Sequence, residues 1–168
     1  MSQEINLSKQ DLIEFFIHHL NKVYAAKSHL LDRLPEILYQ VQFQDLEGAI
    51  FETIEIVRNQ RERMRDIYQI MGAEISSGRV NGLKGLIDDS FEEIKSHQGN
   101  AELRDMSIMF YMTNIEATEM ASFQVLQLLS VKIGNDKIKA LIKENFDEAQ
   151  SGKALLLLIT TKYLTTVN

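Results

Sequence analysis

Apolar side chains recur every three or four residues along almost the whole chain, which is the spacing of one buried face of an α-helix. The first stripe follows Ser8, a residue type that caps helices, with an acidic Asp11 three positions later. Pro35 should end or kink this helix, with a further turn or two through Leu38. The stripe itself consists of Leu12, Phe15, Phe16, His19, Val23, Ala26, Leu30 and Leu34.

The rest of the chain predicts three more long helices and one short one. The second long helix is expected to be capped by Asp45 and stopped by Gly72, and a loop should follow over 73–82. Residues 83–96 have the pattern of a short amphipathic helix, and "HQGN" at 97–100 interrupts it. Two long helices over about 101–133 and 136–163 complete the pattern, joined by Gly134-Asn135. The sequence therefore predicts a single all-α domain over 1–168, a four-helix bundle with a short additional helix between helices 2 and 3.

Two surfaces of this bundle stand out. The stretch "RNQRERMRD" at 58–66 mixes both charges and is interpreted as the solvated face of the second helix. The third long helix is apolar on a second side, so either the short helix or another subunit should cover it. That second side comprises Phe110, Ala117, Ala121, Val125 and Leu128.

Composition excludes several classes of function. A net charge of −6 argues against a nucleic-acid binder or a protein held on anionic membranes. Cysteine is absent, which excludes disulfides, thiolate metal sites and cysteine nucleophiles. No signal peptide is visible, and the longest apolar run, at 154–159, is too short to cross a bilayer. We therefore expect a cytoplasmic protein with neither nucleic acid nor membrane as its partner.

The candidate chemistry centres on "NIEATEMASF" at 114–123, where Glu116 and Glu119 lie among apolar residues on one helical face. A buried carboxylate needs a partner, and in four-helix bundles that partner can be a pair of metal ions. Such a site needs glutamates from two helices and a Glu-x-x-His from each of the others, and no helix here carries Glu-x-x-His. The inward polar or small positions on the other helices are Lys27, Gln60, Asn145, Ala149 and Gly152, with Glu148 and Lys153 at the edges of the last stripe.

The histidines add little to this candidate site. His18 and His29 fall toward the outer side of the first helix, and His97 lies in a loop. His19 is on the core stripe, where a hydrogen-bonded structural histidine is the expected role.

Four segments resemble one known family. They are "FIHHLNKVYAAKSHLLDRLP" at 16–35, "NGLKGLIDDSFEEI" at 81–94, "IEATEMASF" at 115–123 and "LIKENFDEAQ" at 141–150. In this order and spacing they resemble the YciE/YciF family of ferritin-like stress proteins over about residues 12–165. The resemblance implies a ferritin-like bundle, a homodimer, a di-iron or di-manganese centre and a link to stress responses.

The metal-ligand positions that the resemblance implies are largely lost. Where the family pattern has a glutamate in the first helix, this chain has Lys27. Where the pattern has a histidine and a glutamate in the second helix, this chain has Thr53 and Ile56, and Gln60 follows them. Of the fourth-helix pattern only Glu148 remains, next to Ala149 and ahead of Lys153 in place of an aspartate. The remnant of the site thus comprises Lys27, Ile56, Gln60, Glu116, Glu119, Glu148, Ala149 and Lys153.

These replacements predict no metal cofactor. Lys27, and Lys153 with it, could pair with Glu116 and Glu119, and Glu148 could join them or face solvent. The leading interpretation is a non-catalytic, stress-associated protein whose di-metal site is replaced by a lysine–glutamate cluster. Two alternatives remain: an oxidase, peroxidase or iron-handling protein with a partial metal site, and a binder of a small ligand in the vacated core.

Overall fold

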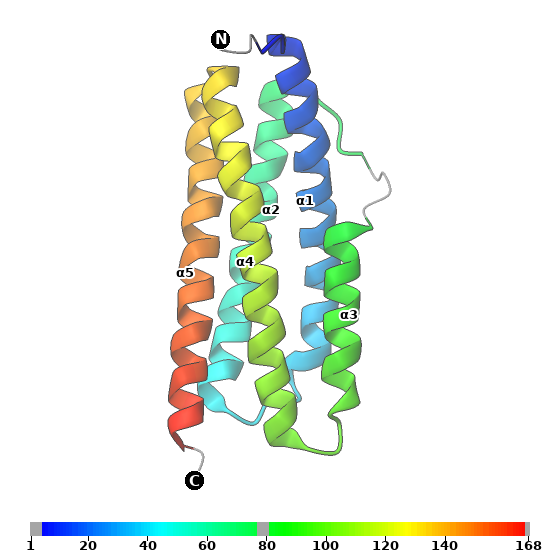
Figure 1. Cartoon of the computed structure of the whole chain (residues 1–168), viewed down its shortest axis with the longest axis vertical. Coiled ribbons are helices and arrows are strands. Elements are labelled where there is room, and N and C mark those ends of the chain that lie inside the picture. Colours follow the sequence, from blue (N-terminus) through cyan, green and yellow to red (C-terminus); the bar gives the residue numbers. More distant parts are fainter. Residues whose placement is uncertain (1–4, 77–80, 167–168) are drawn as a thin grey trace.

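The computed structural model describes residues 5–76 and 81–166, and over these ranges it contains five α-helices and no strand. The helices are α1 (Lys9–Leu38), α2 (Gln44–Met71), α3 (Gly82–Ser96), α4 (Ala101–Ile133) and α5 (Asp136–Thr166). The predicted all-α class is confirmed (Figure 1). Part of the predicted loop, 77–80, lies outside the described residues.

Most predicted helix ends are confirmed by their local chemistry. Ser8 and Asp11 form a reciprocal capping box at the start of α1, and Asn100 caps α4. Gly72 and Gly134 end their helices with φ of 61° and 75°, the left-handed conformation that glycine adopts without steric penalty. The prediction for Asp45 was wrong, because α2 begins at Gln44, and Asp45 lies in its first turn, where it contacts Lys162.

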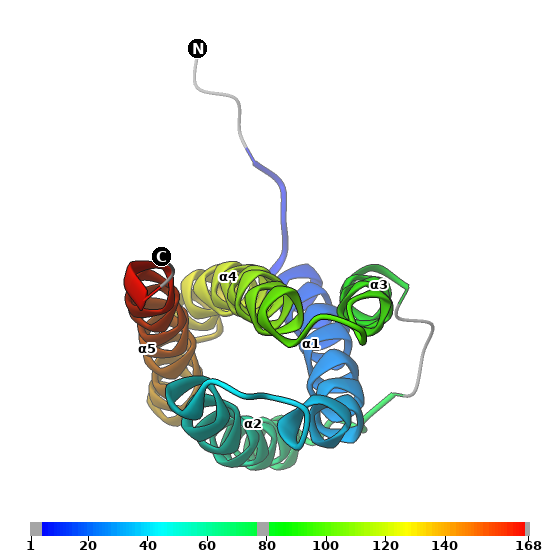
Figure 2. The same cartoon turned by 90° about the horizontal axis from the view of Figure 1, so that it is seen from below.

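The four long helices lie side by side around a common interior, and each runs antiparallel to its neighbours (Figures 1 and 2). Pro35 stays inside α1, which continues to Leu38 as the sequence allowed. The interior contains two clusters of buried apolar residues, one around Leu34, Ile50 and Met109 and one around Phe16, Met64 and Phe123. The candidate site therefore has apolar packing on both sides of it along the bundle. No helix in the described part of the chain is long and apolar enough to cross a membrane.

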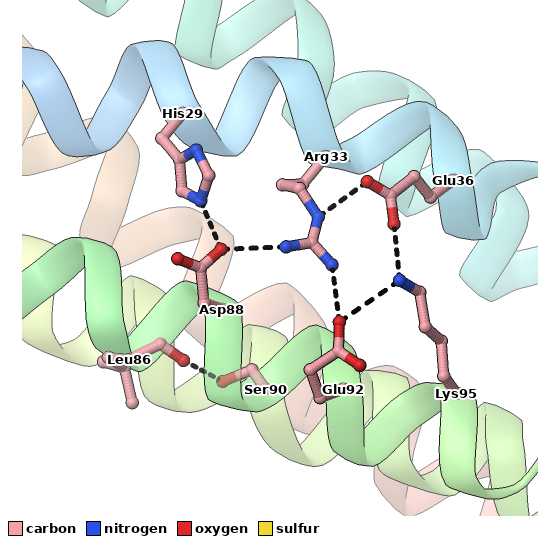
Figure 3. A network of polar contacts seen from close by, with 8 residues as sticks. All are labelled: His29, Arg33, Glu36, Leu86, Asp88, Ser90, Glu92 and Lys95. Atoms are coloured by element: carbon pink, nitrogen blue, oxygen red, sulfur yellow. Dashed lines mark hydrogen bonds and ion pairs between the residues drawn. The ribbon is translucent and has the colours of Figure 1, made fainter.

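Helix α3 lies outside the four long helices, against α1 and α4 (Figure 2). It buries Ile87, Phe91 and Ile94 and is held by a polar network drawn in Figure 3. In this network His29 Nε2 lies 2.5 Å and Arg33 Nη1 2.8 Å from the same oxygen of Asp88. His29 thus lies on the outer side of α1, as expected, and α3 covers that side.

The second apolar side of α4 is only partly covered by α3. Phe110, Val125 and Leu128 remain 61%, 52% and 69% exposed. Where α3 begins, a groove of about 670 Å³ separates the first half of α1 from the last half of α4. His19 lines this groove, half-buried, with its ring in tilted contact with the ring of Phe15. It has no hydrogen bond within the described residues, so its predicted structural hydrogen bond is absent there.

Candidate functional site

Glu116 and Glu119 lie in the middle of α4 and point into the bundle. They are 3% and 2% exposed. Residues three or four apart share a helical face, so the same geometry that buries Met112, Ile115 and Phe123 also buries the two carboxyl groups. The prediction that these glutamates are buried among apolar residues is confirmed.

Lys27 comes from α1 and meets Glu119. Its side chain is completely buried, and its Nζ donates to Glu119 Oε2. The ammonium also lies 5.5 Å from the centre of the Phe123 ring, a favourable cation–π distance. The other oxygen of Glu119, Oε1, is buried without a hydrogen-bond partner. Lysine and glutamate are thus paired inside the bundle, through Glu119 and not through Glu116.

Glu116 has no hydrogen bond and no ion pair within the described residues, although it is almost fully buried. Burial, opposed by the charge of Lys27 and aided by the charges of Glu119 and Glu148, raises the pKa of its carboxyl to about 8. On the α5 side the carboxyl lies against Gly152: a Cβ added there would be 3.4 Å from Glu116 Cδ. Glu116 is therefore the one carboxyl of the α4 pair that no cation neutralises directly.

A second polar layer joins α2 and α5. Gln60 Nε2 donates to the Asn145 carbonyl at 3.3 Å, and Asn145 Nδ2 donates to the Gln60 carbonyl at 3.2 Å. Both side chains are fully buried, and Gln60 Oε1 has no partner. Gln60 thus connects two helices and does not contact the Lys27–Glu119 pair through any hydrogen bond in the described chain.

Glu148 is held by a residue that the sequence analysis treated as solvated. Arg63 makes two hydrogen bonds of 2.7 Å to Glu148, and its Nε lies 2.7 Å from Glu144. Glu148, expected either to join the central cluster or to face solvent, is 28% exposed and is held by the guanidinium of Arg63 from α2. Arg63 lies one turn after Gln60, and that spacing was the available signal for its position on the inner edge of α2.

The remaining predicted positions supply space more than polar groups. Ala149 is fully buried, Ile56 is half-buried, and both are apolar. Lys153 is half-buried and forms no ion pair with any described residue. Its expected pairing with Glu116 and Glu119 was therefore wrong, and Lys27 alone supplies the cation.

The donor set does not fit a di-metal centre. No group of three or more histidine, cysteine, aspartate or glutamate side chains in the described part of the chain could hold a metal ion. The ammonium of Lys27 contacts Glu119 directly and would repel a cation there. As possible metal ligands, Gln60 offers one side-chain oxygen without a hydrogen-bond partner, and the hydrocarbon side chain of Ile56 offers none.

Comparison with known proteins agrees with the helical architecture. A curated relative, Protein YciF of Escherichia coli (strain K12), is 26% identical over 146 residues, which cover 86% of this chain and 87% of YciF. The crystal structure of the E. coli stress protein YciF matches with a TM-score of 0.86 at 22% identity, over 93% of this chain and 98% of that one. The structure of YcfI from Rhodopseudomonas palustris matches with a TM-score of 0.81 at 22% identity, over 93% and 96% of the two chains.

The family assignment rests on the match between this chain and the model of a protein family. The family described as "Domain of unknown function (DUF892)" matches residues 11–166, almost the entire chain. The resemblance to YciE/YciF proteins seen in the four sequence segments is confirmed by this match and by the similarity to YciF. This protein therefore belongs to the DUF892 family.

Proposed function

We propose that this chain is a non-catalytic, ferritin-like protein that works in a stress context and carries a lysine–glutamate pair where its fold could otherwise hold metal ions. The observation that supports this proposal is the buried contact between Lys27 and Glu119. A buried ammonium already neutralises one carboxylate of α4, so Glu119 needs no metal ion as its partner. A cytoplasmic location is part of the same proposal.

The ferritin-like assignment is supported by how the site is distributed over the bundle. Lys27 comes from α1, Gln60 from α2, the two glutamates from α4 and Asn145 from α5. All five side chains are buried between the long helices. This is how bundle proteins build carboxylate sites, with inward side chains from facing helices, but here the ligand types have changed.

Metal analysis of the untagged protein tests the proposal. The purified protein is incubated with excess Fe²⁺ or Mn²⁺ under anaerobic conditions, desalted and analysed by mass spectrometry of the elements. We expect far less than one ion per chain, and the same result for a Lys153→Met variant, because Lys153 does not contact the glutamates. Near-stoichiometric iron or manganese that depends on Glu116 and Glu119 would overturn the proposal.

We further propose that the protein is a homodimer that uses the uncovered apolar side of α4. Phe110, Val125 and Leu128 are each more than half exposed, and α3 leaves this part of α4 open. The adjoining groove continues the apolar surface onto Phe15 of α1. Exposed apolar patches of this kind are typical of protein–protein contact sites.

The oligomeric state can be measured by size-exclusion chromatography with light scattering. We expect a dimer for the unmodified chain and a monomer for Val125→Glu/Leu128→Glu, with the circular dichroism spectrum unchanged. Leu158→Glu on α5 is the matched control, since Leu158 is 67% exposed on a different face and its variant should remain dimeric. A dimer that survives the double substitution would contradict the proposed interface.

A further inference from the structure

A small groove lies between α2 and α5 at the level of the candidate site. Its volume is about 270 Å³, just below the range of about 300–1,000 Å³ typical of pockets for drug-sized ligands. Its walls are mostly apolar, with Glu52 and Thr53 as polar members on α2. The lining residues are Ala49, Glu52, Thr53, Ile56, Ser151, Gly152, Leu155 and Leu156.

Gly152 is the part of the wall that separates this groove from Glu116. A Cβ at this position would lie 3.5 Å from each of the two Glu116 oxygens, so the carboxyl lies directly beside the place that a side chain of residue 152 would occupy. Any larger residue would cover the carboxyl with its side chain. Because Gly152 has no side chain, the carboxyl is left uncovered on the side of the groove.

The charges next to this wall are unbalanced. Lys27 is bound to Glu119, and Arg63 is bound to Glu144 and Glu148. Glu116 is 3% exposed and has neither a hydrogen bond nor an ion pair among the described residues. A buried carboxyl without a partner is neutral or needs a cation, so a bound ammonium would let Glu116 ionise with a partner that the described residues do not supply.

We propose that the α2–α5 groove binds a small organic ammonium ion, with its apolar body against Ile56, Leu155 and Leu156 and its cationic head toward Glu116 past Gly152. This inference rests on the proposed function, because a metal ion on Glu116 would occupy the place of the head group. Glu52 in the groove lining adds a second negative charge and disfavours anionic ligands. A metal ion is a poorer fit than an ammonium, because one carboxylate is free and the walls are hydrocarbon.

The test uses two probes of equal length, n-hexylammonium and n-hexanol, titrated into the full-length protein by calorimetry and followed by amide chemical shifts. We expect hexylammonium to bind and to shift the amides around Gly152, and hexanol to bind at least about tenfold more weakly, because it cannot pair with Glu116. Equal binding of the two probes, or no binding of hexylammonium, would overturn the inference.

Three variants locate the head group. Glu116→Gln keeps the shape of the side chain and should weaken hexylammonium binding by at least about tenfold without changing hexanol binding. Gly152→Ala adds a methyl group at an ordinary contact distance from Glu116, so it should fold and should also weaken binding. Glu55→Gln is the control, since Glu55 is an exposed carboxylate of α2 outside the groove. Unchanged affinity in Gly152→Ala, or an equal loss in all three variants, would contradict the proposed site.

The metal content of the same sample separates this inference from the proposed function. Iron or manganese on Glu116 overturns the proposed function. A metal-free protein that does not bind hexylammonium overturns only the ligand site and leaves the proposed function intact.

Discussion

The substitution Lys27→Met tests the buried pair most directly. Methionine has nearly the length of the lysine stem, so it can fill the same space between α1 and α4 without the ammonium. Glu119 then remains buried, at 2% exposure, with neither of its oxygens paired. Removing one partner of a buried ion pair costs about 3–5 kcal/mol, because the other charge is left uncompensated in a medium of low polarity.

We expect urea denaturation at neutral pH to give this loss of unfolding free energy, with an unchanged dependence on urea concentration. In a chain of this size each kcal/mol corresponds to about 2–4 °C in melting temperature, so the melting point should fall by roughly 6–20 °C. The companion double variant Lys27→Met/Glu119→Met removes both charges together. It should recover most of the stability, because replacing a whole buried pair by apolar side chains is often neutral or stabilising.

The cycle of single and double variants has a clear negative result. A loss below about 1 kcal/mol for Lys27→Met would mean that water reaches the pair or that Glu119 finds another partner. A double variant as unstable as the single one would assign the loss to packing, and the electrostatic reasoning would be wrong.

Three further outcomes follow from the geometry. Because the pKa of Glu116 is raised above its unfolded value to about 8, its contribution to stability is complete below about pH 4.5 and is lost as the pH rises toward 8. The free energy of unfolding should therefore fall by up to about 1.4 kcal/mol per pH unit over this range, and urea denaturation of Glu116→Gln should lack this decline. Asp88→Asn removes the ion pairs with His29 and Arg33, and hydrogen exchange of α3 amides should quicken by up to about fivefold, while Asp89→Asn has no effect. Gly134→Ala should lower the free energy of unfolding by about 1 kcal/mol, because φ is 75° there. An unchanged or raised melting temperature would contradict the assigned turn.

The helices could be predicted from the sequence because local chemistry defines them. The capping box at Ser8, the left-handed glycines and the apolar spacing each act within a few residues, so the printed sequence contains the whole signal. The start of α2 is the exception. Phe43 precedes the helix without any side-chain cap, and its backbone N–H is held by Asp105, which lies 62 residues away and is not visible as a partner in the sequence.

The candidate site could be predicted only in part, and its misses share one cause. Helical periodicity places Lys27, Glu116 and Glu119 inside the bundle, but it does not say which long side chain reaches which carboxylate. Arg63 lies at the edge of the inner face of α2, and its length lets it bend toward Glu148 on α5. Periodicity describes where a Cβ points, whereas the pairing of a lysine or an arginine is decided by the several rotatable bonds beyond it.

The same reasoning explains why Glu116 is the unusual residue of this molecule. Each of the other acidic groups near the centre has a cation within reach: Glu119 has Lys27, and Glu148 has Arg63. Lys153 was the only remaining candidate for Glu116, and it stays at the bundle's edge without an ion pair to any described residue. Glu116 also lies against Gly152, which supplies neither a ligand nor a covering side chain. A carboxyl group that is buried, unpaired and separated from a groove by one glycine either keeps its proton at neutral pH or binds a cation from outside, and the comparison of hexylammonium with hexanol distinguishes the two.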